Sequence, residues 1–384
     1  MAGFMQTRRE QAAQILALRM LGRDVRIELD GSPGARVLEQ ELALYPAASP
    51  ASEPELRFKW GTILHEDGRR ANPRIHEEFS DGFLAHFTTA DVRFRVDDGR
   101  LRRVELTIPP SHRLISTLRK ALDMQFASRE ERAGMVFHEL ALVPAAHWLS
   151  DVAVVHASAM AGPSGEVTLI GGTGGVGKTS LMLDLCLRRG FTFMADDISI
   201  VGADGWVHPN LAYPKIYAYN LQDNPELARR VFQGRRFADR VHWGLHRRRG
   251  LQFVRRRLAP DKLFGAYSAT GGRLSRYFVL VREDRPNIDI TELGAAQAAA
   301  VSVEVMPSEY AHFYNHLHWH AYHRRLDGKE PTITPQDVHA RWRRLLGAVF
   351  QGVRCYMVRV PLNIEHHRFK VEMVERLAHT AEAG

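Results

Sequence analysis

The sequence predicts an α/β protein in which a P-loop domain with a mixed sheet follows a smaller α+β domain. A buried strand over residues 167–170 runs into a glycine-rich phosphate-binding motif, and an apolar helix follows over residues 180–187. From residue 153 onward the pattern reads strand, strand, motif, helix and strand, as in α/β domains. Before about residue 127, short strand segments alternate with turns and carry no chemical motif.

Composition and charge are typical of a globular protein. The chain has 384 residues, of which 45% are hydrophobic and 25% charged, enough for two domains with full cores. No apolar run approaches the roughly 18 residues that a membrane helix needs, so we expect no membrane association. The first residues show no secretory signal, and Cys186 and Cys355 are too few for a disulfide framework. We therefore expect a cytoplasmic protein.

We place a domain boundary near residue 130. Residues 1–130 are the expected α+β domain, whose role the sequence does not indicate, and residues 131–384 are the expected P-loop domain. In the first domain we expect an amphipathic helix over residues 7–21, followed by strands over 24–29, 56–64, 82–87, 92–96 and 101–108. A helix over 131–149 opens the second domain, and a helical extension begins at about residue 300.

The phosphate-binding motif is the octapeptide GTGGVGKT at residues 172–179, which fits GxxxxGK[ST]. Glycine is required because backbone N–H groups must turn inward around phosphate oxygens with no Cβ in the way. Lys178 supplies charge to the β- and γ-phosphates, and the Thr179 hydroxyl can ligate Mg²⁺. The alternative is an ordinary glycine-rich turn. The predicted nucleotide-binding residues are Gly172, Thr173, Gly174, Gly175, Val176, Gly177, Lys178, Thr179 and Ser180.

Two acids and a histidine are the other candidate catalytic residues. Asp196 and Asp197 directly follow a short apolar strand over residues 191–195, where acids can face the metal ion and the γ-phosphate. One aspartate can hold Mg²⁺ together with Thr179, and Asp196 is our candidate for that role; the other can orient or deprotonate an acceptor hydroxyl. Paired acids after a strand also serve as turn residues. His156, in the middle of a strand predicted over 154–159, is either a buried core residue or a group that orients an aspartate.

Positive charge is concentrated in one segment. Residues 229–257 contain eleven arginines and one acid, and aromatic side chains are interleaved with them. Three interpretations are open: a solvated charged face, a recognition surface for an acidic peptide or a phosphate, or a nucleic-acid site, which we rank last. If the segment binds a phosphoryl acceptor, Arg247, Arg248 and Arg249 are the candidate contacts.

Four histidines recur at helical spacing near the C-terminus. His312, His316, His320 and His323 would share one face of a helix over residues 308–326, a spacing able to bind Zn²⁺ or Ni²⁺. Aromatic residues between them also suit packing against another element, and we favour that interpretation.

Together these residues resemble the kinase domain of bacterial HPr kinase/phosphorylase. The resemblance is carried by His156 on its strand, the P-loop at 172–179, the sequence FMADD at 193–197 and the stretch that follows at 207–216. It implies an HPr-kinase-like P-loop domain of the phosphoenolpyruvate-carboxykinase type, ATP and Mg²⁺ as cofactors, and transfer to a serine hydroxyl. It also implies that the protein is a homo-oligomer.

The chain departs from that family at several places. Ala157 follows the histidine where the family has glycine, and the family's C-terminal motif for HPr recognition and phosphorolysis is missing. The chain looks more like a divergent branch that includes kinases of peptide natural-product precursors, such as lasso-peptide precursors.

We therefore predict an ATP-dependent kinase that uses Mg²⁺ and transfers the γ-phosphoryl group to a hydroxyl of a peptide or protein. His156, Lys178, Asp196 and Asp197 are the predicted catalytic residues. The alternatives are a P-loop ATPase with a regulatory or nucleic-acid-associated role, in which water is the acceptor, and a small-molecule kinase.

Overall fold

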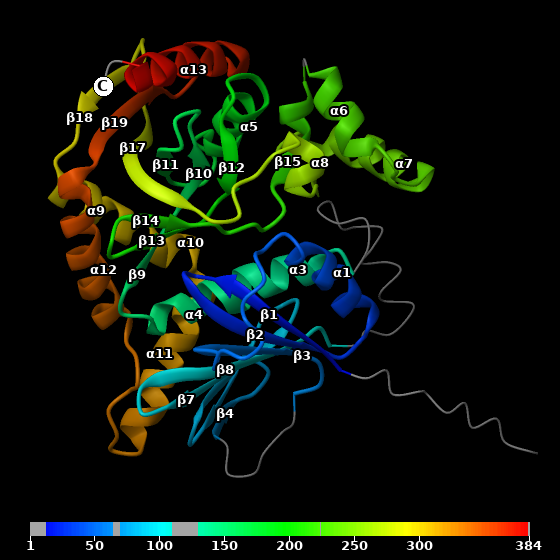
Figure 1. Ribbon diagram of the computed structural model, residues 1–384, viewed down its shortest axis with the longest axis vertical. Helices are drawn as coiled ribbons and strands as arrows, with labels where there is room; N and C mark the ends of the chain where they lie inside the picture. Colours follow the sequence, from blue (N-terminus) through cyan, green and yellow to red (C-terminus); the bar gives the residue numbers. More distant parts are fainter. Residues whose placement is uncertain (1–12, 64–69, 110–129, 223, 383–384) are drawn as a thin grey trace, which may run out of the picture.

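The computed structural model describes residues 13–63, 70–109, 130–222 and 224–382 (Figure 1). Helices and two large sheets form a mixed α/β structure, which agrees with the predicted class. Among these residues no helix combines the length and the apolar character that a membrane crossing requires.

The first sheet is built from the N-terminal part of the chain. Its eight strands run in the order β1-β2-β3-β8-β7-β6-β5-β4. Their bounds are β1 Gln14–Met20, β2 Arg23–Leu29, β3 Leu56–Trp60, β4 Arg70–Asn72, β5 His76–Phe79, β6 Gly82–His86, β7 Asp91–Asp97 and β8 Arg100–Thr107. Apolar and polar residues alternate along β2, and its valine, isoleucine and leucine face the core. The strands that we predict after residue 22 correspond to β2, β3, β6, β7 and β8.

The helix predicted over residues 7–21 is wrong in its described part. Residues 14–20 form β1, which pairs antiparallel with β2 from Gln14 opposite Leu29 to Met20 opposite Arg23. Leu21 and Gly22 form the two-residue turn, and their φ angles of 54° and 78° are the positive pair that a tight hairpin turn needs. A neighbouring partner strand therefore outweighs the helical spacing of the apolar residues. Residues 1–12 lie outside the described part of the chain.

A helical segment joins the two sheets. It comprises α3 Arg132–Phe137, the π-helical turn η1 His138–Leu142, α4 Val143–Ala145 and the 3-10 turn η2 Ala146–Trp148, and it confirms the helix predicted over 131–149. Phe137 packs on Phe58 of β3 with ring centroids 5.1 Å apart, and Trp148 stacks on Phe94 of β7 at 5.5 Å. One hydrophobic core therefore contains side chains from both sheets.

The second sheet carries the P-loop. Seven of its strands run in the order β12-β10-β11-β17-β14-β13-β9, while β19 pairs with β17 and β18 with β19. The strands β11, β17 and β19 are parallel and their neighbours antiparallel, so the sheet is mixed. The bounds are β9 Val152–Val155, β10 Ala157–Ala161, β11 Val167–Gly172, β12 Thr192–Ala195, β13 Ser199–Gly202, β14 Trp206–His208, β17 Gly272–Glu283, β18 Asp289–Glu292 and β19 Arg354–Pro361.

Helices and short strands complete the fold around the second sheet. They are α5 Lys178–Arg188, β15 Lys215–Tyr217, η3 Ala218–Leu221, α6 Pro225–Phe232, α7 Phe237–His246, η4 Arg247–Arg249, β16 Arg255–Arg257, α8 Pro260–Phe264, α9 Ala295–Glu304, α10 Met306–Glu309, α11 Ala311–Leu326, α12 Pro335–Val349, η5 Phe350–Gly352 and α13 His366–Glu382. In Figure 1, α6 and α7 project as an arm, and α11 extends toward the first sheet, where it contacts β5 and β6. The stretch from about residue 300, predicted as a helical extension, also supplies β19.

A buried ion pair ties the first sheet's helix to the second half of the chain. α1 (Pro33–Leu42) packs on α3 and carries Glu41. Its carboxylate accepts hydrogen bonds from Arg257 Nη2 at 2.5 Å and Nη1 at 3.1 Å, and from the Tyr213 backbone N–H at 3.0 Å. Glycine is required at 134, because a Cβ there would lie 1.7 Å from a Glu41 oxygen.

We predict that Glu41→Gln lowers the free energy of unfolding by about 3–5 kcal/mol, because it leaves the Arg257 guanidinium buried without a counter-charge. Urea denaturation followed by circular dichroism measures this. Glu53→Gln is the matched control, since it breaks the exposed Arg57–Glu53 ion pair of 2.6 Å and should cost no more than about 1 kcal/mol. Equal losses for the two variants would contradict the role given to Glu41.

Candidate active site

The predicted P-loop has the backbone conformation that its sequence indicates. β11 ends at Gly172, and α5 begins at Lys178. Gly172, Gly175 and Gly177 have φ angles of 126°, 77° and 110°, which side-chain-bearing residues rarely adopt. A Cβ at Gly172 would also lie 2.4 Å from the Leu280 carbonyl oxygen. The N-terminus of α5 therefore follows a glycine-rich loop of the type whose N–H groups bind anions.

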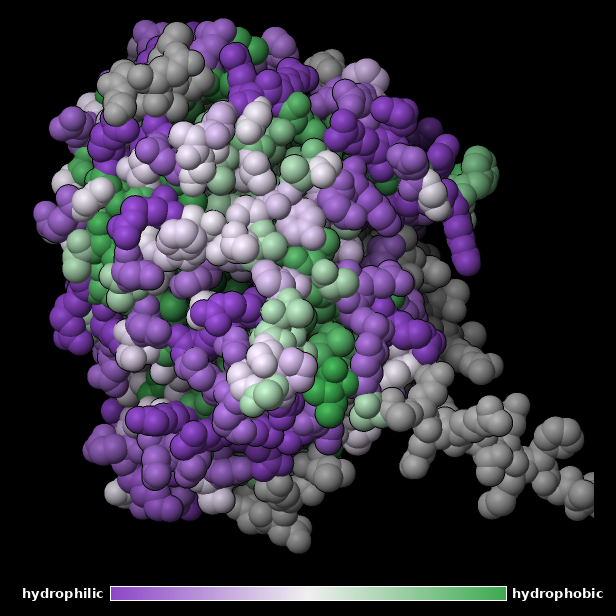
Figure 2. Space-filling model, viewed as in Figure 1, coloured by the Kyte–Doolittle hydropathy of each residue, from purple (hydrophilic) through white to green (hydrophobic). Residues whose placement is uncertain are grey.

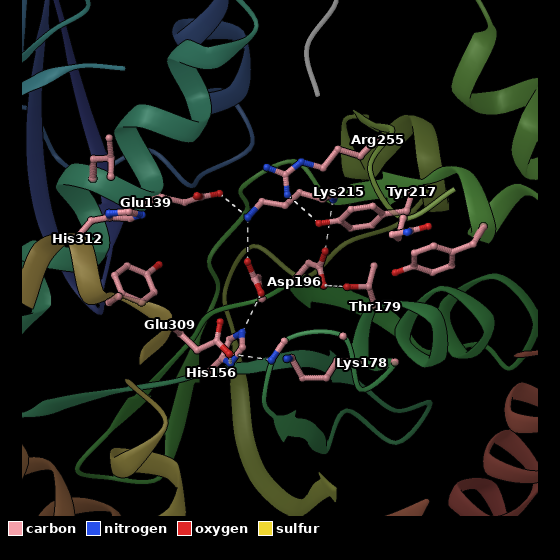
Figure 3. A pocket seen from close by; sticks show the side chains of 18 of the residues that line it. Glu139, His156, Lys178, Thr179, Asp196, Lys215, Tyr217, Arg255, Glu309 and His312 are labelled. Carbon is pink, nitrogen blue, oxygen red and sulfur yellow. Dashed lines mark hydrogen bonds and ion pairs between the residues drawn. The ribbon is translucent and has the colours of Figure 1, made fainter. Parts of the chain in front are cut away.

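A cavity of about 540 Å³ lies at the mouth of this loop (Figure 3). Its lining includes five predicted P-loop residues: Gly174, Gly175, Gly177, Lys178 and Thr179. It also includes all three other predicted catalytic residues: His156, Asp196 and Asp197. The remaining predicted P-loop residues, Gly172, Thr173, Val176 and Ser180, do not line it.

Asp196 is buried and faces the first turn of α5. Its Oδ1 accepts hydrogen bonds from the Thr179 hydroxyl at 2.9 Å and the Ser158 hydroxyl at 3.1 Å. Burial, and then the negative charge of Asp197, raise the pKa of Asp196. The pair of oxygens from Thr179 and Asp196 is the type of donor set that Mg²⁺ prefers.

Asp197 has different surroundings. It is half-buried, and its Oδ1 lies 3.0 Å from His156 Nε2 while its Oδ2 accepts from Lys215 Nζ at 2.9 Å. Burial opposes ionisation, but Lys215 and His156 outweigh it and hold the pKa of Asp197 well below its ordinary value. Its φ of 74° is a left-handed conformation that non-glycine residues rarely adopt. Such strained residues concentrate at functional sites.

Lys215 is a site residue that the sequence analysis does not identify. Its ammonium group lies between Glu139 Oε1 at 2.7 Å and Asp197 Oδ2 at 2.9 Å. Burial opposes the charged form, yet Asp197 and Glu139 outweigh it and raise the pKa of Lys215. The sequence offered one indication of its importance: lysine is rare in this chain, with seven residues in all. After Asp196 and Asp197, β15 is the first strand that contains a lysine or an arginine.

The prediction that His156 lies in the middle of one strand is wrong. His156 lies between β9, which ends at Val155, and β10, which begins at Ala157. β9 pairs with β13, whereas β10 pairs with β11 and β12, so the chain changes neighbours at this residue. The break places the imidazole beside the acids instead of in the sheet core. Its Nδ1 lies 3.6 Å from Glu309 Oε1, on the side away from Asp197.

An internal carboxylate occupies the P-loop's anion-binding position. Glu309, the last residue of α10, accepts a hydrogen bond from the Gly174 backbone N–H at 2.7 Å (Figure 3). Lys178 Nζ donates to the carbonyl oxygens of Gly172 and Thr173 at 3.1 and 2.9 Å. Burial lowers the pKa of Lys178, with nearby carboxylates opposing the shift. Sequence reasoning also misses Glu309, which lies 135 positions from the loop.

The basic segment contributes a different arginine from the three that we predict. Arg255 lines the cavity and donates to the Tyr217 hydroxyl at 2.8 Å. Arg247, Arg248 and Arg249 form η4, are exposed, and do not line it.

The four predicted histidines divide into two sets. His312 lines the cavity, whereas His316, His320 and His323 are buried against the first sheet. There His316 Nδ1 lies 3.2 Å from His76 Nδ1, and His320 Nδ1 lies 2.8 Å from a Glu78 oxygen. Within the described ranges, no three histidine, cysteine or acidic side chains have a geometry able to hold a metal ion. His316 and His320 thus form polar contacts between α11 and β5, and the His323 ring stacks on that of His76 with centroids 5.7 Å apart.

The comparisons with known proteins add little. No family model and no curated protein matches the chain. Among solved structures, it is similar to the HPr(Ser) kinase/phosphatase from Coxiella burnetii, with 14% sequence identity, 60% of this chain and 99% of that chain covered, and a TM-score of 0.28. A similarity of this size supports no inference about activity.

We predict that Glu309→Gln tightens the binding of ATP with Mg²⁺ by about tenfold, because it removes a charge-assisted hydrogen bond with which a phosphate oxygen must compete at Gly174. Isothermal titration calorimetry measures the change. Glu304→Gln, on the exposed end of α9, is the control and should leave the Kd unchanged. Weaker binding in Glu309→Gln would show instead that the carboxylate helps to hold the nucleotide.

Proposed function

We propose that the protein is an ATP-dependent kinase that transfers the γ-phosphoryl group to a hydroxyl, specifically a serine hydroxyl of a peptide or protein. The observation that supports this most directly is that the adjacent residues Asp196 and Asp197 have different hydrogen-bond partners. Asp196 contacts Thr179 of the P-loop, whereas Asp197 is held ionised by Lys215 and His156 and faces the cavity.

The phosphate side of the site is suited to a nucleoside triphosphate. The Gly174 N–H already binds a carboxylate oxygen, so at least this loop amide is oriented toward an anion. The cavity volume is within the range of small-molecule sites. Thr179 and Asp196 would hold the Mg²⁺, which when bound neutralises charge on the β- and γ-phosphates. Lys178 would leave the loop carbonyls and donate to phosphate oxygens.

The acceptor side is suited to a hydroxyl. Asp197 stays ionised at neutral pH, so its carboxylate can accept a hydrogen bond from the hydroxyl and orient the oxygen in line with the γ-phosphorus. A weak base is sufficient, because the transition state of phosphoryl transfer is loose and depends mainly on positioning and charge stabilisation. His156 and Lys215 act as positioning residues through Asp197. The same cavity is also lined by Tyr217, Tyr219, Tyr310, Phe313 and Arg255.

A transfer assay separates the proposal from an ATPase. The protein is incubated with [γ-³²P]ATP, Mg²⁺ and an array of serine-containing peptides. A kinase labels peptides, and alanine replacement of the serine abolishes the label. Release of free phosphate with no labelled acceptor would favour the ATPase alternative, and stimulation of that release by DNA or RNA would favour its nucleic-acid form.

We predict that Lys178→Ala abolishes detectable transfer and weakens ATP binding, because it removes the main positive charge at the β- and γ-phosphates. The fold should survive, since the Lys178 ammonium group donates its hydrogen bonds to carbonyl oxygens of the loop itself, those of Gly172 and Thr173. Calorimetry and the transfer assay measure both effects. Lys262→Ala, at an exposed position on α8, is the control. Unchanged ATP affinity and turnover in Lys178→Ala would refute the P-loop assignment.

We predict that Asp196→Asn and Asp197→Asn each lower kcat by about 10²–10⁴-fold, but with different signatures. Asp196→Asn should raise the Mg²⁺ concentration needed for half-maximal rate, because it weakens a metal ligand. Asp197→Asn should leave that concentration unchanged, because it removes only the group that orients the acceptor. Steady-state kinetics across a Mg²⁺ series measures both, with Asp261→Asn on α8 as control. Near wild-type rates in both variants would make the pair a structural turn.

A further inference from the structure

Helix α7 presents an apolar stripe to solvent. Phe237, Val241 and Leu245 are spaced four residues apart, so they share one face of the helix, and they are 80%, 44% and 58% exposed. Figure 2 shows hydrophobic surface on this projecting arm beside strongly hydrophilic side chains. Single exposed apolar residues are ordinary on protein surfaces, but an aligned set of three is not.

The opposite face of α7 is fully used in holding the helix in place. Asp239 accepts from the buried Arg256 at 2.7 and 2.9 Å and from Arg235 at 3.0 Å. Trp243 packs against Phe232 with ring centroids 5.2 Å apart. These contacts hold the buried face of α7 against the rest of the protein, so the exposed apolar stripe has a defined orientation.

Cations flank the stripe. Arg236 and Arg240 lie at the start and in the middle of α7, and Arg247, Arg248 and Arg249 follow its last turn as η4. All five are exposed, and within the described ranges none of them forms an ion pair with an acidic side chain. By contrast, Arg235, Arg256 and Arg257 of the same segment are paired with acids.

The stripe is joined to the cavity by a short connection. After η4, Gly250 turns the chain with a φ of 143°, and the following turn and strand β16 place Gln252 and Arg255, respectively, in the cavity lining. The surface and one wall of the cavity thus belong to a single segment, residues 237–255. A partner bound along α7 and η4 would therefore lie on the same segment as two residues of the cavity wall.

We propose that α7 and η4 form a docking surface for an acidic, amphipathic segment of the peptide or protein acceptor, away from the hydroxyl that is phosphorylated. Apolar side chains of the segment pack on the stripe, and its carboxylates pair with the flanking arginines. Two of the three stripe residues, Val241 and Leu245, are aliphatic, which suits a peptide better than nucleic acid, whose bases stack on aromatic side chains. The role of the segment as part of an acceptor rests on the proposed kinase function.

Binding is tested with a defined probe, a fluorescein-labelled helical peptide that has leucine at every fourth position and glutamate between. Fluorescence anisotropy should show binding to the wild type that weakens as salt is added. Phe237→Ser with Leu245→Ser should raise the Kd by about tenfold, and so should the triple variant Arg247→Gln, Arg248→Gln and Arg249→Gln. Controls away from α7 and η4, Leu326→Ser at an exposed position and Arg324→Gln with Arg325→Gln on α11, should have no effect.

A kinetic measurement connects docking to transfer. A serine peptide that the protein phosphorylates is compared with the same peptide extended by the acidic segment. The wild type should have a KM about tenfold lower for the extended peptide, both variants should lose that difference, and the KM for ATP should stay constant.

The docking proposal and the kinase proposal can fail separately. Lys178→Ala should still bind the labelled peptide although it transfers no phosphate. If the wild type binds the labelled peptide but transfers phosphate to no hydroxyl, the kinase proposal is overturned and the docking proposal stands. A Kd unaffected by both variants overturns the docking surface, whatever the kinase assay shows. Tighter, variant-sensitive binding to random DNA or to phosphatidylserine vesicles than to the peptide would also overturn it, in favour of nucleic acid or a lipid surface.

Discussion

The charge balance around Lys215 governs the candidate active site. Four acids, Glu139, Asp196, Asp197 and Glu309, line one cavity, and carboxylates this close repel one another in a medium of reduced dielectric. The Lys215 ammonium group lies between Glu139 and Asp197. Although burial opposes ionisation, Lys215 together with His156 lowers the pKa of Asp197, whereas burial and the charge of Asp197 raise the pKa of Asp196. Adjacent aspartates therefore have pKa values shifted in opposite directions.

Three consecutive arginines on β16 connect this site to the rest of the molecule. Side chains alternate along a strand, and here each of the three has a different destination. Arg255 lines the cavity, Arg256 pairs with Asp239 of the arm, and Arg257 pairs with Glu41 of the first sheet's helix. In the sequence, this run of basic residues resembles a solvated charged face. In the structure, two of its three arginines form buried ion pairs that connect β16 to α7 and to α1.

The sequence was sufficient to predict those parts of the candidate site that are formed by residues adjacent in the chain. The P-loop between β11 and α5 follows from eight contiguous positions, and the two aspartates follow from their place after a short strand. Lys215, Glu139 and Glu309 could not be found in this way, because each is a single charged residue on its own element and only distant contacts bring it to the cavity. For the same reason Arg255, and not the more conspicuous triplet at 247–249, proved to be the cavity arginine.

Local pattern also failed where a tertiary neighbour decides the conformation. The residues of β1 have helical spacing, yet the turn at Leu21 and Gly22 brings them against β2. His156 follows an apolar run that reads as one strand, yet the chain changes sheet neighbours there. Neither partner can be read from the residues alone.

The position of β19 has a consequence for how the chain acquires its structure. The parallel strands β11, β17 and β19 begin at residues 167, 272 and 354, so the central part of the P-loop sheet joins segments nearly two hundred positions apart. Contacts this distant are slow to form because a long loop must close first. On the ribosome, the P-loop strand emerges long before its last neighbour exists. The first sheet, whose described strands lie before residue 108, can assemble during synthesis, whereas the P-loop sheet must wait for almost the whole chain.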